Sequence, residues 1–297
     1  MRNISFNKFY RTFNLVSLSL IIISLILLLF KGLNYGVDFK GGTLIEVRTS
    51  KNSSDISKIR DSLNQMNLGD VSVKSFGNDN DFVVKFEKKE SNNPEFIENI
   101  KKKLSNSIGN VDFRRVENVG PKVSSELLKS GVIAIALSLA AMLLYIWIRF
   151  EWQFSLGAII ALFHDVIITL GIFSLFSLEI NLSIVAAVLT IVGYSMNDTV
   201  VIFDRVRENL KKSADIKIFE LTNISINETL SRTIITSVTT LLALLSIYFF
   251  GGEILKGFSL AMILGVIFGT YSSIYIANPI LVMLKVSQRT IIKEEEN

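Results

Sequence analysis

Six long apolar runs constrain this chain more than any other feature of its sequence. A helix needs about 20 apolar residues to cross roughly 30 Å of hydrocarbon, whereas a surface helix of a soluble protein is apolar along one stripe only. The sequence therefore predicts six membrane-spanning helices. The runs at 12–30, 130–148, 233–252 and 257–284 carry no charged residue, the run at 152–178 contains only His164 and Asp165, and the run at 180–203 contains only Asp198.

The composition agrees with a membrane protein and excludes several classes of function. Hydrophobic residues make up 49% of the 297 residues and charged residues only 20%, which is typical of a chain with many spans. The net charge of +4 is scattered, so no nucleic-acid partner is expected. The chain has no cysteine, one histidine and no phosphate-binding loop of the GxxxxGKS or GxxxxGKT type. We therefore expect no metal, no cofactor and no enzymatic activity.

The positions of Lys and Arg predict how the spans are oriented. Basic residues gather before the first span, between the fourth and fifth, and after the sixth, and such residues favour the cytoplasmic side. The first run is too long for a signal peptide and lacks a small-residue cleavage site after it, so we interpret it as an uncleaved helix. The expected segments are cytoplasmic tails at 1–11 and 285–297, spans at 12–31, 129–148, 152–177, 180–203, 232–251 and 257–284, an extracytoplasmic domain at 32–128 and a cytoplasmic loop at 204–231.

The segment between the first two spans has the pattern of a small folded domain. "TLIEVR" at 43–48 alternates like a strand, and apolar residues recur at helical spacing from 56 to 66. Two strand-like runs, "VSVKSF" and "DFVVKFE", precede a second helical pattern at 96–108 and a last strand, "VDFRRV". The order β-α-β-β-α-β predicts an α+β ferredoxin-like domain with two helices on one face of a sheet. We interpret it as a contact or substrate-handling module.

Asp198 is the most informative polar residue inside a span. It lies about six residues, or roughly 9 Å, from the expected cytoplasmic end of the fourth span. An ionised Asp in mid-membrane costs on the order of 2.5–3.5 kcal/mol, so it should face other helices. Ser195, Asn197 and Thr199 are local hydrogen-bonding candidates, and Arg232, at the edge of the fifth span, is the expected counter-charge. Asp198 and Arg232 are then either a structural ion pair or a protonatable acid with its switching partner in a proton path.

His164 and Asp165 form the second polar pair inside a span. A lone histidine between helices often serves packing, but an adjacent carboxylate makes a role in proton transfer equally plausible. Because adjacent residues on a helix point in different directions, at least one of the two should reach the bundle interior. Both readings stay open. Gly265 and Gly269, in "GVIFG", are interpreted as a close helix-packing surface.

Four stretches together resemble the SecF branch of the SecD/SecF family, within the resistance-nodulation-division superfamily of proton-driven exporters. The resemblance covers nearly the whole chain. The outer segment of roughly 100 residues favours SecF, because SecD chains usually have a larger one. The stretches are "GLNYGVDFKGGT" (32–43), "LFHDVIITLGIFSLF" (162–176), "TIVGYSMNDTVVIFDRVREN" (190–209), and "RTIITSVTTLLAL" with "FGGEILKGFSLAMILGVIFGTYSSIYIA" within 232–277.

The resemblance implies a partner-dependent machine in a bacterial cytoplasmic membrane. Such chains pair with SecD, act at the SecYEG channel and have SecA, YajC and YidC as further partners. They use the proton motive force to promote translocation of a polypeptide after SecA-driven transfer. The resemblance places Asp198 and Arg232 in the proton pathway, with Asn197 beside them and Asp165 and His164 as further candidates. Gly36, Asp38, Gly41 and Gly42 match the family signature and are expected to form a hinge before the outer domain.

Two other functions remain alternatives at this point. The first is a proton antiporter for small molecules of the same superfamily, which the compact outer domain disfavours. The second is a scaffold that conducts no protons and only stabilises SecD and the channel. A scaffold leaves the polar groups within the spans unexplained.

Overall fold

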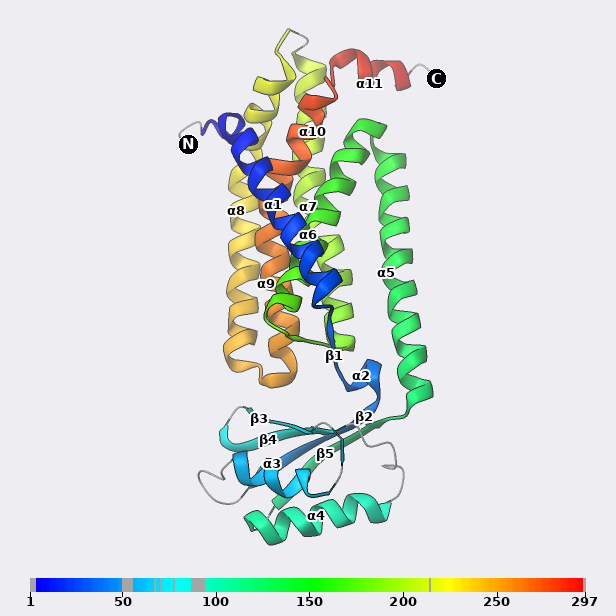
Figure 1. Cartoon of the computed structure of the whole chain (residues 1–297). Helices are drawn as coiled ribbons and strands as arrows, with labels where there is room; N and C mark the ends of the chain where they lie inside the picture. The colour runs from blue at the N-terminus through cyan, green and yellow to red at the C-terminus, as the bar shows by residue number, and fades with distance from the viewer. Residues whose placement is uncertain are drawn as a thin grey trace.

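The computed structural model describes residues 4–49, 56–66, 68–69, 71–76, 78–86, 94–109, 111–213 and 215–295. A long helical bundle stands on a small α+β domain, and both ends of the chain lie at the far end of the bundle (Figure 1). Within the described residues, six helices are long and apolar enough to cross a membrane. They are α1 (Tyr10–Phe30), α5 (Pro121–Arg149), α6 (Trp152–Leu175), α7 (Leu182–Lys212), α8 (Ile218–Phe250) and a last span made of α9 (Glu253–Ser272), η2 (Ser273–Ala277) and α10 (Asn278–Met283).

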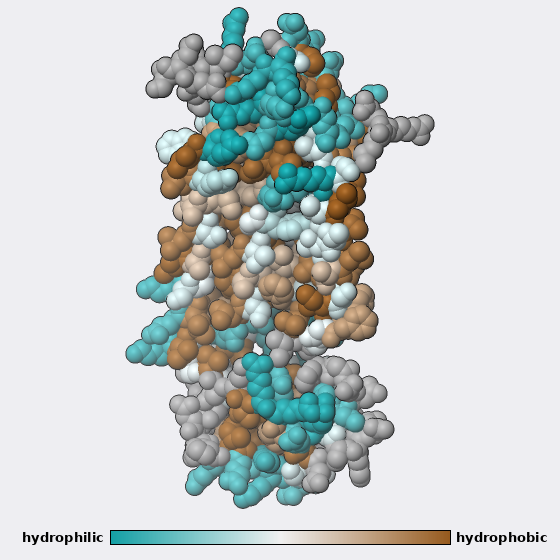
Figure 2. All heavy atoms as spheres, turned by 180° about the vertical axis from the view of Figure 1, so that it is seen from behind, coloured by the Kyte–Doolittle hydropathy of each residue, from teal (hydrophilic) through white to brown (hydrophobic). Residues whose placement is uncertain are grey.

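The six long helices form an inner and an outer set. Half or more of the apolar stretch is buried in α6, α7 and the last span, against less than a fifth in α1, α5 and α8. The outer helices therefore offer their apolar side chains to lipid or to a partner. Figure 2 shows mostly apolar residues along the middle of the bundle on this face, with hydrophilic residues gathered at the end away from the small domain.

The last span changes its helical geometry in mid-course. Residues Ser273–Ala277 form a π-helix between α9 and α10. Pro279 follows at the start of α10, and proline lacks the N–H that would bond to the carbonyl of Tyr275, four residues earlier. π-Helical turns relieve such a mismatch and recur at functional sites. The polar residues next to this turn, Ser272, Ser273 and Asn278, are all fully buried.

The small domain (residues 42–119) has the expected ferredoxin-like topology. Its strands lie in the order β3-β4-β2-β5, and all neighbours are antiparallel. Inward residues such as Ile45, Val47 and Phe82 pack against Leu63 and Leu104 of the two helices, which cover one face of the sheet (Figure 1). The predicted fold class is thereby confirmed. The elements are β2 (Gly42–Thr49), α3 (Ile56–Asn64), β3 (Val71–Phe76), β4 (Asn78–Phe86), α4 (Pro94–Ile108) and β5 (Val111–Val119).

Three short elements that the sequence pattern did not reveal connect this domain to the bundle. They are β1 (Asn34–Tyr35), α2 (Val37–Lys40) and β6 (Glu179–Ile180). β1 and β6 pair in parallel although they are far apart in the sequence. Strands of two residues are too short to show any periodicity, so this contact is visible only in three dimensions.

The segment at 204–231, expected as the cytoplasmic connection between two spans, is mostly helical. α7 continues to Lys212 and α8 already begins at Ile218. Charged pairs one turn apart, such as Arg205–Glu208 and Glu208–Lys212, support the polar end of α7. α7 and α8 thus form one long antiparallel hairpin. After the last span, a short helix, α11 (Gln288–Glu295), ends the described chain, and a 3₁₀ turn, η1 (Phe6–Phe9), precedes α1.

Candidate functional site

Asp165 occupies the centre of the bundle and is fully enclosed by hydrogen-bonding groups. Its Oδ2 accepts hydrogen bonds from Ser195 Oγ on α7 (2.5 Å) and from Ser272 Oγ on α9 (2.8 Å). Its Oδ1 lies 2.8 Å from His164 Nδ1. The carboxyl group is 0% exposed, so these three contacts replace the water that it lost on burial. One carboxyl group therefore connects α6, α7 and α9.

His164 is buried beside Asp165 and packs against an aromatic ring. Its ring is stacked on Tyr271 at 5.8 Å between centroids. Tyr271 Oη in turn donates to the carbonyl of Phe13 in α1 and lies 2.8 Å from Ser17 Oγ. His164 Nε2 is buried and has no hydrogen-bond partner among the described residues. Both residues of this adjacent pair reach the interior, where at least one was expected.

Asp198 lies on α7 one turn after Ser195 and is 3% exposed. Its Oδ2 accepts a long hydrogen bond of 3.4 Å from Thr270 Oγ1 on α9. Thr270 Oγ1 is also 2.8 Å from Ser237 Oγ on α8. Next to Asp198, Thr199 Oγ1 lies 2.7 Å from Ser273 Oγ at the start of the π-helix. We call this set the polar seam: Asp165, Ser195, Asp198, Thr199, Ser237, Thr270, Ser272 and Ser273.

Arg232 lies at the same height as Asp198 on the neighbouring helix. Tyr194 Oη on α7 donates to the carbonyl of Thr236 on α8 (3.2 Å). Asp198 follows Tyr194 by one helical turn and Arg232 precedes Thr236 by one turn, which is the same direction in an antiparallel hairpin. The expected direct ion pair is not formed: among the described residues no salt bridge within 4.0 Å joins Asp198 to Arg232. Arg232 and Asn197 are both exposed. Asp198 is instead hydrogen-bonded to Thr270, which also contacts Ser237.

Small residues on α9 allow the polar seam to form. A Cβ atom placed on Gly269 would lie 3.1 Å from the Cα and Cβ of Ser195, and one on Gly265 would overlap the side chain of Ile191. Close approach of this kind lets short hydroxyl side chains bond across the helix interface. Ser272 therefore reaches Asp165. This agrees with the interpretation of "GVIFG" as a packing surface.

The seam residues on α8 and α9 are functional candidates that sequence reasoning missed. Ser237, Thr270, Ser272 and Ser273 stand in apolar runs, where the group "GTYSS" at 269–273 was a usable signal. Serine and threonine are common in membrane helices, however, because they bond to their own backbone. Ser273, for example, also donates to the carbonyl of Gly269.

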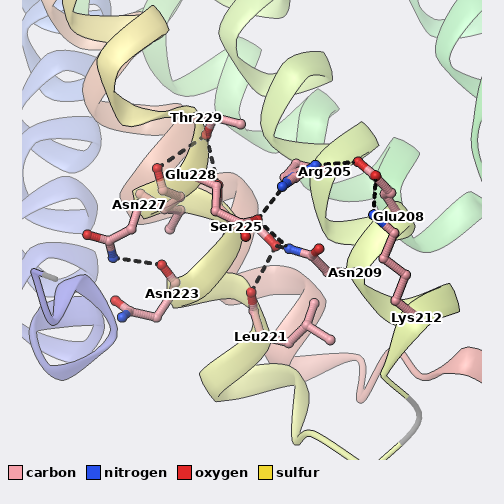
Figure 3. Close-up of polar contacts among 11 residues, drawn as sticks. Arg205, Glu208, Asn209, Lys212, Leu221, Asn223, Ser225, Asn227, Glu228 and Thr229 are labelled. Carbon is pink, nitrogen blue, oxygen red and sulfur yellow. Dashed lines mark hydrogen bonds and ion pairs between the residues drawn. The ribbon is translucent and has the colours of Figure 1, made fainter. Parts of the chain in front are cut away.

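Charged residues fasten the α7–α8 hairpin at the end away from the small domain. Figure 3 shows Arg205 between Glu208 and Glu228, with Asn209 one turn further along α7 and reaching Glu228 from the same side. Arg205 Nε donates to Glu228 Oε2 at 2.6 Å, and Asn209 Nδ2 donates to the same oxygen at 2.7 Å. This cluster lies two turns along α7 from Asp198. It joins α7 to α8 at this end of the hairpin.

The signature residues lie at the other end of the bundle. Gly36 and Asp38 contact the turn between α6 and α7: Gly36 N–H donates to the carbonyl of Ile180 (2.8 Å), and Asp38 Oδ2 accepts from Leu182 N–H (2.8 Å). Gly41 and Gly42 have φ angles of +80° and +136°, which residues with a Cβ rarely adopt. They set the bend from α2 into the first strand of the small domain.

The arrangement suits groups that hold and pass protons. Asp165 and Asp198 are carboxyl groups removed from water, and hydroxyl groups connect each of them to α9. Hydroxyls both donate and accept hydrogen bonds, so they can stabilise either protonation state. Among the described residues there is no cluster of three His, Cys, Asp or Glu residues that could hold a metal ion.

Two family models match the chain. The model described as "Protein export membrane protein SecD/SecF, C-terminal" matches residues 99–287, and the model of the "SecD/SecF GG Motif" matches residues 26–53. The second match contains Gly36, Asp38, Gly41 and Gly42. The first contains the whole polar seam.

Relatives and solved structures agree with these matches. The chain is 49% identical over 266 residues to protein translocase subunit SecF of Rickettsia bellii, which covers 88% of both chains. It is 43% identical over 281 residues to the same subunit of Cereibacter sphaeroides, covering 92% of this chain and 86% of the relative. The crystal structure of SecDF, a translocon-associated membrane protein from Thermus thermophilus, superposes with a TM-score of 0.86 at 35% identity.

That structural match covers 95% of this chain but only 39% of the SecDF chain. A second SecDF structure, in a super-membrane-facing form, matches with a TM-score of 0.72 at 34% identity over 100% of this chain and 40% of its own. This chain thus spans about two fifths of the SecDF polypeptide. The chain belongs to the SecD/SecF family of protein-export membrane proteins, and its relatives place it in the SecF branch.

Proposed function

We propose that this chain uses the proton motive force to promote protein translocation across the cytoplasmic membrane, after the transfer that SecA drives. It does so as a complex with SecD at the SecYEG channel, with YajC and YidC as further partners. Both termini lie in the cytoplasm, and the small domain lies on the opposite side, where the polypeptide emerges. The driving energy is about 2.3 kcal/mol per charge for each 100 mV of potential, in addition to the pH difference.

The observation that carries this proposal is the polar seam itself. Two carboxyl groups stand in the middle of an apolar bundle. The hydroxyl groups of Ser195, Ser272 and Thr270 donate hydrogen bonds to them. A buried charge in a membrane is costly, and a scaffold gains nothing from two of them. The proposed route runs through Asp198 and Asp165, with His164 at its inner end. Ser195, one turn before Asp198 on α7, is the residue of that helix that is hydrogen-bonded to Asp165.

Arg232 is proposed to act as the switching partner of Asp198. The two residues share a height but are not in contact, and Arg232 is exposed on the surface of the hairpin. When Asp198 loses its proton, the charge on the carboxylate attracts Arg232; when it is protonated, Thr270 and Ser237 suffice as partners. Asn197, also exposed beside Asp198, lines the same side of α7.

The exposed helices α1, α5 and α8 are proposed to be where SecD binds. Their apolar faces are the largest uncovered surfaces of the bundle, and the matched SecDF polypeptides are more than twice as long as this chain. Gly41 and Gly42 form the proposed hinge, because their positive φ angles hold the bend into the small domain.

The test is export into vesicles that contain SecYEG, SecD and this chain, with and without a proton gradient. Asp198→Asn keeps the size of the side chain but cannot ionise. We expect the complex with SecD to form normally and the gradient-dependent part of export to disappear. Asp204→Asn is the matched control, because Asp204 is an exposed residue of the same helix paired with Arg149. Full gradient-dependent export with Asp198→Asn would falsify the proton route.

A further inference from the structure

The turn between α6 and α7 is attached to the signature segment by several independent contacts. Asn34 and Tyr35 pair in parallel with Glu179 and Ile180. Lys31 Nζ donates to the carbonyl of Leu175 at 2.7 Å, and Asn34 Nδ2 donates to the carbonyl of Ser177 at 3.0 Å. The backbone on both sides of the turn is therefore held by the stretch of chain that leads into the small domain.

Asp38 binds the end of a helix rather than a loop. Leu182, whose N–H donates to Asp38, is the first residue of α7. Asn181 caps the same helix by accepting from Ile184 N–H at 3.1 Å. Free N–H groups at a helix start favour a negative charge. Asp38 therefore fastens the signature segment to α7, the helix that carries Ser195 and Asp198.

Glu179 adds a second attachment, directly to the sheet of the small domain. Its carboxylate forms an ion pair with Lys85 of β4, and both side chains are only about one-fifth exposed. The same oxygen of Glu179, Oε1, also lies against Gly36, where a Cβ atom would be 2.5 Å away. Around this contact the sheet and the bundle are separated by a cavity of about 440 Å³, lined in part by Lys74, Arg115 and Tyr248. Glu179 and Lys85 both line this cavity, and their ion pair connects the bundle to the sheet across it.

We propose that Glu179, Lys85 and Asp38 form a coupling joint. It stays closed during the cycle and passes movement of the α6–α7 pair to the small domain. The α6–α7 pair carries both carboxyl groups of the polar seam, so a change at Asp165 or Asp198 that shifts these helices also moves their shared turn. The joint ties the turn to the sheet, so movement of the turn tilts the small domain about the proposed hinge at Gly41 and Gly42. This inference rests on the proposed function, because it names the route by which the proton site acts on the domain.

The first test reverses the charges of the joint in the full chain with SecD. Glu179→Lys and Lys85→Glu should each form the complex and support gradient-independent export, while gradient-dependent export falls by about fivefold or more, the lower range of coupling between sites. The double variant Lys85→Glu/Glu179→Lys should recover it. Lys74→Glu, an exposed residue lining the same cavity, is the control and should leave export unchanged. Full activity of both single variants, or no recovery in the double variant, overturns the joint.

The second test measures the joint without relying on proton transfer. The chain has no cysteine, so spin labels at Ser72→Cys and Phe176→Cys, both exposed positions, report one distance between the sheet and the turn. We expect a single narrow distance distribution, broadening with Glu179→Lys and narrowing again in the charge-swapped double variant. An unchanged distribution with Glu179→Lys overturns the joint. If this test succeeds while Asp198→Asn keeps gradient-dependent export, the proton route fails and the mechanical joint stands.

Discussion

Ser195 on α7 donates a hydrogen bond of 2.5 Å to Asp165 on α6, and Asp198 follows three residues later on the same face of α7. Residues three apart are neighbours on a helix surface, so the helix position that contacts Asp165 lies next to the one that carries Asp198. Asp165 also holds Ser272 of α9. A change of charge at either carboxyl group therefore acts on the packing of α7 against both α6 and α9.

Replacing Asp165 should be as harmful to gradient-driven export as replacing Asp198. Asp165→Asn keeps the shape of the side chain, and its amide can still bond to Ser195 and Ser272 because hydroxyls donate or accept. We therefore expect a folded complex with SecD whose export with a gradient equals that without one. Export assays and co-purification of SecD measure the two properties. Normal stimulation by the gradient would exclude Asp165 from the route.

His164→Phe separates packing from proton transfer at His164. Phenylalanine preserves the stacking on Tyr271 but removes the nitrogen that lies 2.8 Å from Asp165. If His164 takes part in the route, gradient-dependent export should fall while the melting temperature of the complex in detergent stays within a few degrees. Unchanged export would assign His164 to packing alone.

Arg232 should act through its charge and not through the stability of the fold. It is exposed and makes no ion pair with Asp198 in the described structure, and surface substitutions of this kind usually change stability by less than about 0.5 kcal/mol. Arg232→Gln should therefore abolish gradient-dependent export without lowering the melting temperature, whereas Arg232→Lys should retain part of it. Equal export by the glutamine variant and the natural protein would rule out a switching role.

Sequence patterns revealed the spans and the carboxyl groups because both are local features. A charge inside an apolar run is visible in a single stretch, and so is the β-α-β-β-α-β order of the small domain. The partners of these groups are not local. Ser272 meets Asp165 across 107 residues of sequence, and Thr270 meets Asp198 across 72. The group "GTYSS" at 269–273 marks a polar stretch in the run at 257–284, but it does not show which of its hydroxyls bond to other helices.

The relation of Asp198 to Arg232 also shows that sequence positions do not predict side-chain contacts between helices. Their equal height follows from the lengths of two antiparallel helices and was predicted. Their separation depends on which side chains fill the space between α7, α8 and α9, which is a matter of packing. The signature glycines were likewise interpreted as a hinge, whereas Gly36 and Asp38 are docked on residues 179–182. Only a three-dimensional structure brings positions 36 and 179 together.

Gly269→Val should destabilise the bundle by overpacking the interface between α7 and α9. A new Cβ there lies 3.1 Å from the backbone of Ser195, and inserting extra methyl groups into a packed core typically costs about 1–3 kcal/mol. Thermal unfolding in detergent should show a lower midpoint, with weaker coupling to the gradient because Ser195 is displaced. Gly193→Ala is the control: a Cβ at Gly193 meets nothing within 4 Å, so this variant should be neutral or slightly stabilising.

The small domain should lose local stability in acid through one ion pair. Arg48 Nε and Nη2 donate to the two carboxylate oxygens of Asp81 at 2.5 and 2.6 Å, and this contact lowers the pKa of Asp81 below its usual value. An Asp with a lowered pKa in the folded state stabilises it above the unfolded pKa of about 3.9, and that contribution is lost as pH falls through the folded value.

Hydrogen exchange of the β2 and β4 amides in the full chain, between pH 7 and pH 3, measures this effect. Protection in the natural protein should exceed that in Asp81→Asn at neutral pH, and the difference should shrink once the pH drops below about 4. Asp81→Asn is the reference for the natural protein at each pH, because the variant has no carboxyl group to protonate at this position. A difference that stays constant down to pH 3 would show that Arg48 stabilises the strands through packing of its side chain and not through the charge of Asp81.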